Sequence, residues 1–216
     1  MDYKSETYWE KSWNEENISE LFGYLTKYNK WHFEEMEIFK RYKLKKVCDA
    51  ACGFGAYSLA FSSNGFDTFG FDISAKAIEI AKQGLKAYGI DSSRYKVANI
   101  IDTGYADETF DGVIAHGVID HLTAELAHKA VDELLRITVR GGLLLLAFDA
   151  VEQSDYEVDH VVLEDGSMKY TEESRKGMIF CPYDWGRIDL LLKDCKILSK
   201  RVNRKNEKLV VVEKRG

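Results

Sequence analysis

The chain has 216 residues and a formal net charge of −6, with 45% hydrophobic and 31% charged residues. This length suits one domain with a sizeable core, and the composition excludes a disordered chain or a repeat array. No apolar stretch is long enough to cross a membrane, and the first residues lack the apolar core of a signal peptide. We therefore expect a single-domain, soluble, cytoplasmic protein without a membrane partner, and its acidic balance disfavours nucleic acid as a partner.

The four cysteines, Cys48, Cys52, Cys181 and Cys195, show no Cys-x-x-Cys spacing and accompany no cluster of histidines. Scattered thiols of this kind are typical of buried residues rather than of disulfides or zinc ligands. We therefore predict buried thiols and no metal site.

Residues 6–41 carry aromatic side chains at helical spacing and predict two or three helices ahead of the first strand. We assign residues 1–43 to an N-terminal helical cap. Tyr8, Trp9 and Trp13 form one aromatic group if the first helix folds over the site, where ring faces attract a cation. Packing in the core is the alternative role for these rings.

Short apolar runs then alternate with amphipathic helical patterns, which predicts an α/β fold with a parallel sheet covered on both faces. In such folds ligands bind at the carboxyl ends of the strands. We assign residues 44–149 to this cofactor-binding core. The expected strands are residues 46–50, 68–72, 95–99, 112–116 and 143–148, and the clearest helices are residues 75–88 and 124–138.

The most informative segment is the break between the first strand and the next helix, where small residues surround Gly53 and Gly55. A strand that ends in such a loop and feeds a helix directs backbone N–H groups at one point, where they bind anions. Asp72 ends the second strand nineteen residues after Gly53, the distance expected for a carboxylate on a ribose diol. Its alternative role is to help start the helix whose own cap is Ser74. Together these features predict a nucleotide-type cofactor.

Ser58 stands where a dinucleotide fingerprint carries its third glycine, which disfavours NAD. S-adenosylmethionine has a ribose and an adenine but no pyrophosphate. Its amino-acid end needs donors for a carboxylate and acceptors for an ammonium, and Asp49 and the glycine loop supply both. We therefore predict S-adenosylmethionine as the cofactor and S-adenosylhomocysteine as its product.

The run DAACGFG from Asp49 to Gly55 resembles the first motif of the class I S-adenosylmethionine-dependent methyltransferases. Many members carry glycine where this chain has Ala51, a residue that favours negative φ. The resemblance implies a Rossmann-like, doubly wound, seven-stranded and mainly parallel sheet, with Asp72 on the ribose and Asn99 at the adenine edge. Asp102 is the alternative to Asn99. The cofactor residues expected on this basis are Asp49, Ala51, Cys52, Gly53, Gly55, Asp72, Ile73, Asn99, Ile100 and His116.

Residues 150–181 are long for a plain connection and predict a substrate or lid insert, with two short strands around the Asp165-Gly166 turn. Residues 182–216 form the closing segment, which begins with a helix over residues 183–193. The strand-like runs 195–202 and 208–214 are joined by a linker too short for a crossover, so they must be antiparallel. These segments leave no room for the substrate domain of a dehydrogenase.

A methyl group on a sulfonium is already activated, so holding an acceptor in line and excluding water supply much of the catalysis. A hydroxyl or protonated amine also needs a side chain that takes its proton. The catalytic candidates are His116, Asp149 and His160; their alternative roles are a strand-end cap, a loop carboxylate and a solvent-facing strand residue. For His121 we favour a structural role.

Aromatic residues at both ends of the chain are the candidates for the wall of the acceptor pocket. Tyr183 and Trp185, at the start of the last helix, join Tyr8, Trp9 and Trp13 in this role, and packing is the alternative. We predict a methyltransferase that acts on a small molecule by in-line displacement. Three alternatives stay open: a protein or RNA acceptor, a non-catalytic cofactor-binding regulatory or interaction protein, and an NAD-dependent oxidoreductase.

Overall fold

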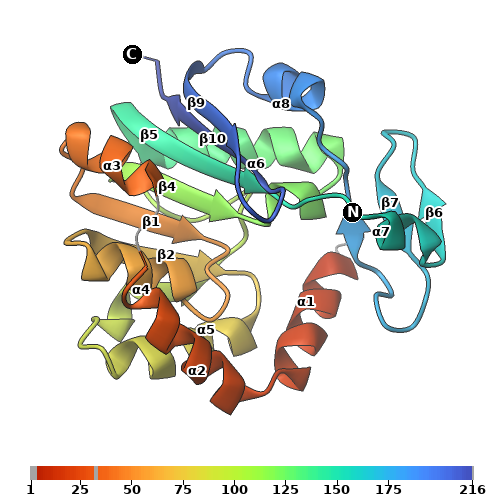
Figure 1. Ribbon diagram of the computed structural model, residues 1–216, viewed down its shortest axis with the longest axis horizontal. Helices are drawn as coiled ribbons and strands as arrows, with labels where there is room; N and C mark the ends of the chain where they lie inside the picture. Colours follow the sequence, from red (N-terminus) through yellow and green to blue (C-terminus); the bar gives the residue numbers. More distant parts are fainter. Residues whose placement is uncertain (1–3, 32–33, 216) are drawn as a thin grey trace.

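A seven-stranded sheet forms the centre of the computed structural model, which describes residues 4–31 and 34–215 (Figure 1). Its strands are β1 (Lys46–Ala50), β2 (Asp67–Asp72), β3 (Tyr95–Val97), β4 (Phe110–His116), β5 (Thr138–Phe148), β9 (Lys196–Val202) and β10 (Lys208–Glu213). The strand order is β3-β2-β1-β4-β5-β10-β9. The first five strands are mutually parallel, whereas β10 is antiparallel to both β5 and β9. The mainly parallel sheet and its antiparallel closing hairpin are thus confirmed.

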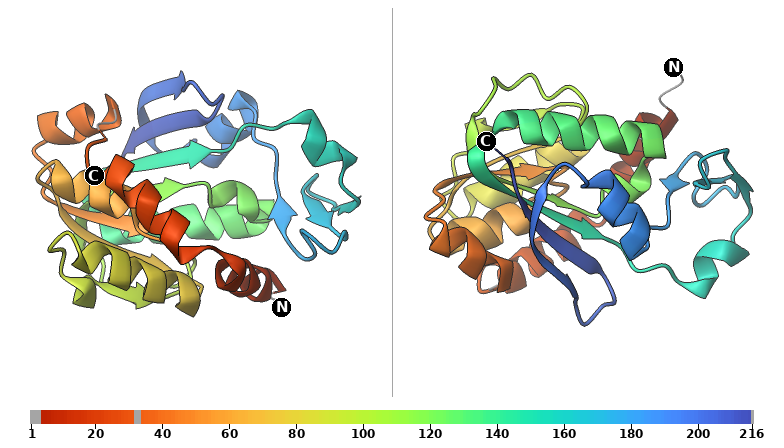
Figure 2. Two further views of the ribbon diagram at one scale, coloured as in Figure 1. Left: turned by 60° about the horizontal axis from the view of Figure 1, so that its bottom comes forward. Right: turned by 90° about the horizontal axis from the view of Figure 1, so that it is seen from above.

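Helices cover both faces of this sheet (Figure 2). They are α1 (Lys4–Glu15), α2 (Ile18–Tyr28), α3 (Glu34–Arg41), α4 (Ala56–Ser63), α5 (Ala75–Lys86), α6 (Ala124–Ile137), α7 (Gln153–Glu157) and α8 (Trp185–Leu191), with 3-10 turns at Ser92–Arg94 and Ile119–His121. In the described part of the N-terminal region, α1, α2 and α3 precede β1, as the helical spacing predicted.

Alternating side chains of the central strands pack into two separate apolar clusters. In β4, Val113 and Ala115 pack with residues of α6 and α8, whereas Ile114 packs on the opposite face with Met36 and Phe39 of α3. Strands buried on both faces read as continuous apolar runs, and this is why β4 and β5 lack a polar face. The doubly wound architecture follows from this two-sided burial.

The expected strand bounds differ from the observed ones mainly at β3 and β5. β3 ends at Val97, and the Ala98 N–H makes a last hydrogen bond to the Asp72 carbonyl at 2.9 Å before a loop that the Asn99–Asp102 bridge closes. β5 begins at Thr138, immediately after α6, rather than at Leu143.

The insert over residues 150–181 folds as a small unit at the end of the sheet toward which the parallel strands run, beside α1 (Figure 1). It contains α7 and a three-stranded sheet of β6 (His160–Val162), β7 (Met168–Tyr170) and β8 (Ile179–Phe180). The Asp165-Gly166 turn joins β6 to β7 as predicted, while α7 and β8 were not foreseen. Asp165 Oδ2 accepts a 2.6 Å hydrogen bond from the N–H of Ala124, so the insert caps the start of α6.

All four cysteines are buried and free, which confirms the expectation of buried thiols. Within residues 4–31 and 34–215, none of the helices combines the length and apolar content that a bilayer crossing requires.

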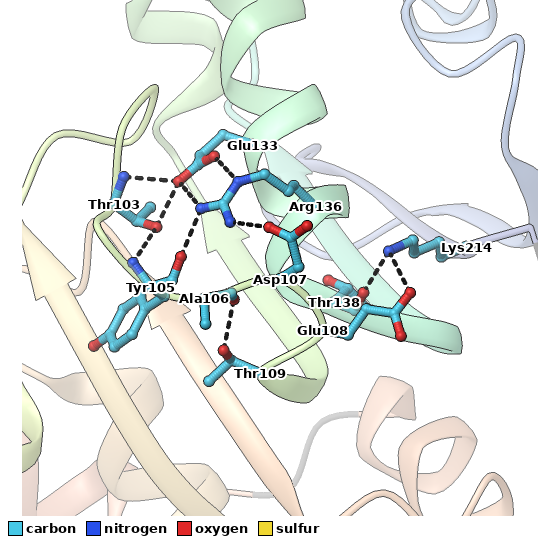
Figure 3. A network of polar contacts seen from close by, with 10 residues as sticks. All are labelled: Thr103, Tyr105, Ala106, Asp107, Glu108, Thr109, Glu133, Arg136, Thr138 and Lys214. Carbon is cyan, nitrogen blue, oxygen red and sulfur yellow. Dashed lines mark hydrogen bonds and ion pairs between the residues drawn. The ribbon is translucent and has the colours of Figure 1, made fainter.

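A buried carboxylate ties the loop after β3 to α6 (Figure 3). Glu133 Oε1 accepts hydrogen bonds from the N–H of Thr103 at 2.8 Å and from its hydroxyl at 2.6 Å. Arg136 donates from Nε to Glu133 Oε2 at 2.6 Å and from Nη1 to Asp107 at 2.5 Å. Burial raises the pKa of Glu133, but the bonds from Arg136 and Thr103 outweigh it and lower the pKa to about 2. The network therefore holds the loop that carries Asn99 against the body of the fold.

Replacing Glu133 with glutamine should lower the free energy of unfolding by about 1–3 kcal/mol, the usual worth of hydrogen bonds to a charged group. A carboxylate with a lowered pKa stabilises the fold fully above its ordinary pKa of 4.5, and this stabilisation is lost as the pH falls toward about 2. Urea unfolding at pH 7, 4 and 3 should show the wild type and Glu133→Gln converging at low pH. Glu125→Gln, an exposed residue of the same helix, is the control, and an equal gap at every pH would contradict the prediction.

Candidate active site

A cavity of about 280 Å³, the central cavity, lies at the carboxyl ends of β1, β2 and β4 and beneath α1. The structure brings eleven of the predicted site residues to its lining: Trp9, Trp13, Asp49, Ala51, Cys52, Gly53, Asp72, Ile73, Asn99, Ile100 and His116. The other six do not line it: Tyr8, Gly55, Asp149, His160, Tyr183 and Trp185.

The loop between β1 and α4 alternates left-handed residues. Ala51, Gly53 and Gly55 have φ values of 55°, 51° and 85°. Ala51 therefore adopts the conformation that glycine favours, although alanine reaches it only with strain. Gly55 turns away from the cavity, since a Cβ at this position would lie 2.9 Å from Cδ1 of Leu85 on α5. Its role in the structure is to let α4 begin close to α5.

Asp49 at the end of β1 is buried and joins the strand to the first turn of α4. Its Oδ2 accepts hydrogen bonds from the N–H of Ser58 at 2.9 Å and from the Ser58 hydroxyl at 2.7 Å. Burial raises the pKa of Asp49 to about 6, despite these two bonds. Ser58, which we had weighed only as a missing glycine, thus holds the carboxylate in place at the cavity wall.

Asp72 helps to start α5, which is the alternative role that its sequence position suggested, and it also lines the cavity. Oδ2 accepts from the N–H of Gly53 at 2.9 Å, and Oδ1 accepts from the N–H of Ser74, the N-cap of α5, at 2.9 Å. Burial raises the pKa of this carboxyl group as well. Asp72 therefore links the glycine loop to the start of α5 while facing the cavity.

Asn99 shapes its own loop. Its Oδ1 accepts from the N–H of Ile101 at 3.1 Å, which closes a local turn next to the cavity lining formed by Ile100. Asp102, the alternative adenine ligand, is exposed and does not line the cavity.

Helix α1 forms the roof of the central cavity. The Trp13 ring lies over the glycine loop, so that a Cβ on Gly53 would be 2.8 Å from its Cζ2. Glu10 Oε2 accepts from the Ser74 hydroxyl at 2.6 Å and from the N–H of Lys76 at 3.3 Å, and this fixes α1 to the start of α5. The bond from Ser74 lowers the pKa of Glu10. Glu10 was not among the predicted site residues, because an acidic residue in a surface helix carries no signal of such a distant contact.

Two histidines of the cavity wall each face a carboxylate. His116 Nε2 lies 3.4 Å from Oε2 of Glu207, which comes from the β9–β10 connection. His121 Nε2 lies 3.5 Å from Oδ2 of Asp149, and its ring packs edge-on against Trp9 at a centroid distance of 5.0 Å. His121, for which we favoured a structural role, lines the cavity.

The sequence did contain a signal for His121. It follows β4 by five residues, and the topology already placed the end of that strand at the site. Asp120 adds a further carboxylate, whose Oδ2 accepts from the N–H of Asp149 at 2.6 Å. One ligand-type atom from each of Asp120, His121 and Asp149 lies within 4.8 Å of the others. Asp120, His121 and Asp149 therefore form one compact cluster of ionisable side chains.

The remaining candidates pack outside the central cavity. His160 bonds the carbonyl of Val158 through Nδ1 at 2.7 Å within the insert. Tyr183 stacks on Phe148 in the core, and Trp185 packs against the same cluster. Tyr8 packs against the apolar residues of the insert and so docks α1 onto it.

Comparison with known proteins places this geometry in context. Residues 48–146 match the family model of a methyltransferase domain. A tRNA (carboxymethyluridine(34)-5-O)-methyltransferase of Arabidopsis thaliana is 33% identical over 110 residues, which cover 50% of this chain and 25% of that protein. The chain spans less than half the length of the curated relatives that it matches.

Two solved structures share the fold at 18% identity. A SAM-dependent methyltransferase of Methanosarcina mazei has a TM-score of 0.71 and covers 85% of this chain and 98% of its own. The magnesium protoporphyrin IX methyltransferase of Synechocystis, with bound SAM, has a TM-score of 0.58 and covers 92% and 78%. At this identity the likeness concerns the fold.

The sheet order, the antiparallel β10 and the site at the carboxyl ends define a Rossmann-like methyltransferase fold. The matching domain over residues 48–146 and the DAACGFG motif support a class I S-adenosylmethionine-dependent methyltransferase with S-adenosylmethionine as the cofactor. A tRNA methyltransferase among the relatives means that our exclusion of nucleic acid as a partner is not supported.

Gly53→Ala and Ala51→Gly should have opposite effects. In Gly53→Ala the new Cβ would collide with the Trp13 ring, and the alanine would have to adopt the positive φ of this position. Affinity for S-adenosylmethionine should therefore fall about tenfold or more. Ala51→Gly relieves the strain at φ 55°, so affinity should be kept and the free energy of unfolding should change by no more than about 1 kcal/mol. Isothermal calorimetry and urea unfolding of both variants measure this, and equal loss of affinity in the two would contradict it.

Proposed function

We propose that this chain transfers the methyl group of S-adenosylmethionine to a small-molecule acceptor by in-line displacement. The observation that carries the proposal is the roof over the central cavity, where α1 holds Trp13 over Gly53 and Trp9 against His121. A covered site excludes water and suits an acceptor small enough to enter it.

The groups of the cavity fit the cofactor by their chemistry. Each oxygen of Asp72 already accepts one backbone N–H and keeps a lone pair for a ribose hydroxyl. Asp49 uses only Oδ2 on Ser58, which leaves Oδ1 for the ammonium of the methionine end. Ile73 and Ile100 supply apolar walls for the adenine, with Asn99 at its edge.

When bound, S-adenosylmethionine supplies an activated methyl group on a sulfonium. The residues of the chain then have to orient the acceptor, keep water out and take up any proton that the acceptor releases. His116 lies at the cavity for such work, and Asp149 acts through its contact with His121. His160 has no comparable position, because its ring stays within the insert against Tyr170.

An RNA acceptor is the second candidate, because the Arabidopsis relative is a tRNA methyltransferase. The net charge of −6 argues against it, since RNA binding relies on basic surfaces that neutralise phosphates. The small-molecule acceptor therefore fits the chain better.

Transfer of label from methyl-labelled S-adenosylmethionine tests the proposal. The protein is incubated separately with a metabolite extract, total RNA and a protein extract, and label is expected in the small-molecule fraction. Asp72→Ala should abolish this label, because it removes both the proposed ribose ligand and the anchor of the glycine loop. Label in RNA alone would establish the second candidate, and cofactor binding without transfer to any fraction would indicate a binding protein.

Affinity for S-adenosylmethionine should weaken as the pH falls below about 6, the pKa of Asp49. A protonated Asp49 cannot attract an ammonium, so each pH unit below the pKa costs up to about tenfold in affinity. Calorimetry from pH 5 to pH 8 should show this decline in the wild type and in the exposed control Asp91→Asn. Asp49→Asn should bind weakly with a flat profile over the same range, and an unchanged decline in this variant would assign the effect to another group.

A further inference from the structure

Two histidine–carboxylate pairs form a partition between the central cavity and a second cleft. His116 and His121 line the central cavity, while their partners Glu207 and Asp149 line a polar cleft of about 510 Å³, the outer cleft. The Asp149 carboxylate also approaches the cavity directly, since a Cβ on Gly117 of the cavity lining would lie 3.3 Å from its Oδ1. A molecule held in the outer cleft would therefore be one side chain away from the cofactor site.

The charged lining of the outer cleft favours a cation. It contains four carboxylates and two cations: Asp149, Glu152, Asp155, Glu207, Arg175 and Lys205. Both cations already face carboxylates, Arg175 at 2.9 Å from Asp155 and Lys205 at 3.9 Å from Glu207. Contact with His116 lowers the pKa of Glu207, and contact with His121 outweighs burial and lowers the pKa of Asp149, so both stay ionised. The surplus of negative charge attracts cations and repels anions.

The His121–Asp149 pair is built to hold one proton. Nδ1 of His121 lies 3.1 Å from the carbonyl oxygen of Ile179, which can only accept, so Nδ1 carries a hydrogen and Nε2 is the site for a further proton. Burial lowers the pKa of His121, but Asp149 and Asp120 outweigh it and raise the pKa. Asp120 Oδ1 is buried and has no hydrogen-bond partner among the residues that the structure describes, which adds to the preference for a positive ring.

Both acidic and basic groups surround the His121–Asp149 pair. Asp120 and Asp149 face the imidazole of His121, while His116 and Lys205 act on Asp149 from the cavity wall and from the β9–β10 connection. Removing Asp149 should therefore lower the pKa of His121, because its nearest stabilising charge is lost.

We propose, on the basis of the methyltransferase function above, that the acceptor is a small primary or secondary amine that enters the outer cleft as a cation, and that His121 with Asp149 takes its proton. The ammonium first binds the carboxylates of Asp149 and Glu207. One N–H proton then moves to Nε2 of His121, which frees the nitrogen lone pair. That lone pair forms the new N–C bond as the C–S bond of the methyl donor breaks. The electron pair of the C–S bond stays on sulfur, and the sulfonium becomes a neutral thioether. The proton leaves His121 for solvent after the product departs.

Matched acceptors test the substrate class. Methyl-labelled S-adenosylmethionine is offered with a panel of small amines, each paired with the alcohol of the same carbon skeleton. Labelled product is expected from amines and not from the paired alcohols, with kcat/KM rising with pH as the pair loses its proton. Transfer to alcohols only, or no amine product while S-adenosylhomocysteine still binds by calorimetry, would overturn the proposal. Loss of cofactor binding itself would instead count against the function proposed above.

Variants of the pair separate proton transfer from binding. His121→Gln should lower kcat by about 10²–10⁴-fold, with a much smaller change in affinity for S-adenosylhomocysteine. His121→Ala should regain part of the rate when imidazole is added, which a merely structural role would not allow. Asp149→Asn should raise KM for the amine and move the acidic limb of the pH profile to lower pH, because the pKa of His121 falls. His128→Gln, on the exposed face of α6, is the matched control and should behave as the wild type.

Three results would overturn the role of the pair. They are a His121→Gln enzyme with full kcat, an Asp149→Asn profile with an unshifted acidic limb, and activity that a chelator removes and a divalent metal restores. The last would make Asp120, His121 and Asp149 ligands of a metal rather than proton carriers.

Discussion

The buried Asp49 carboxylate at the end of β1 is the contact on which the rest of the site depends. Its two bonds from Ser58 fix the first turn of α4 relative to the strand. The loop between Asp49 and Ser58 then has to span a short distance, and it does so with left-handed conformations that include Ala51 and Gly53. Because burial disfavours its charge, the same carboxylate is poised to gain from a cationic ligand. One side chain thus positions the loop and prepares the charge of the site.

The second constraint is the convergence of α1 and Asp72 on the start of α5. Asp72 bonds Ser74 from the sheet side, and Glu10 bonds the same serine from the roof. The roof is therefore attached to the same serine that Asp72 bonds, so the position of α1 over the cavity and the position of Asp72 are coupled. The insert contacts α1 through Tyr8. A polar contact at Glu10 and an apolar contact at Tyr8 thus help to keep α1 over the cavity.

The sequence predicted those features that local pattern determines. The bounds of β1, the DAACGFG loop and Asp72 all depend on residues within one β-α-β unit, where strand periodicity, small residues and spacing are visible in the chain. It did not predict that Glu10 would reach Ser74, because the two are 64 residues apart and α1 has no strand to define its direction. Tyr183 and Trp185 do not line the central cavity for a related reason: helical spacing shows that an aromatic residue packs, but it does not show which residues it packs against. The contact between His121 and Asp149 could not be predicted, because α6 and β5 separate the two residues in the chain.

The proposed role of the two histidine–carboxylate pairs explains why ionisable groups lie beside a covered cavity. A buried ion pair costs desolvation energy and is poor support for stability by itself. In this protein two partly buried histidine–carboxylate pairs each have the ring toward the central cavity and the carboxylate toward the outer cleft. Had stability been their only role, apolar residues of similar volume would serve as well at both positions. The consistent orientation instead suits a site where a cation approaches from one side and a methyl donor from the other, with one proton to be removed between them.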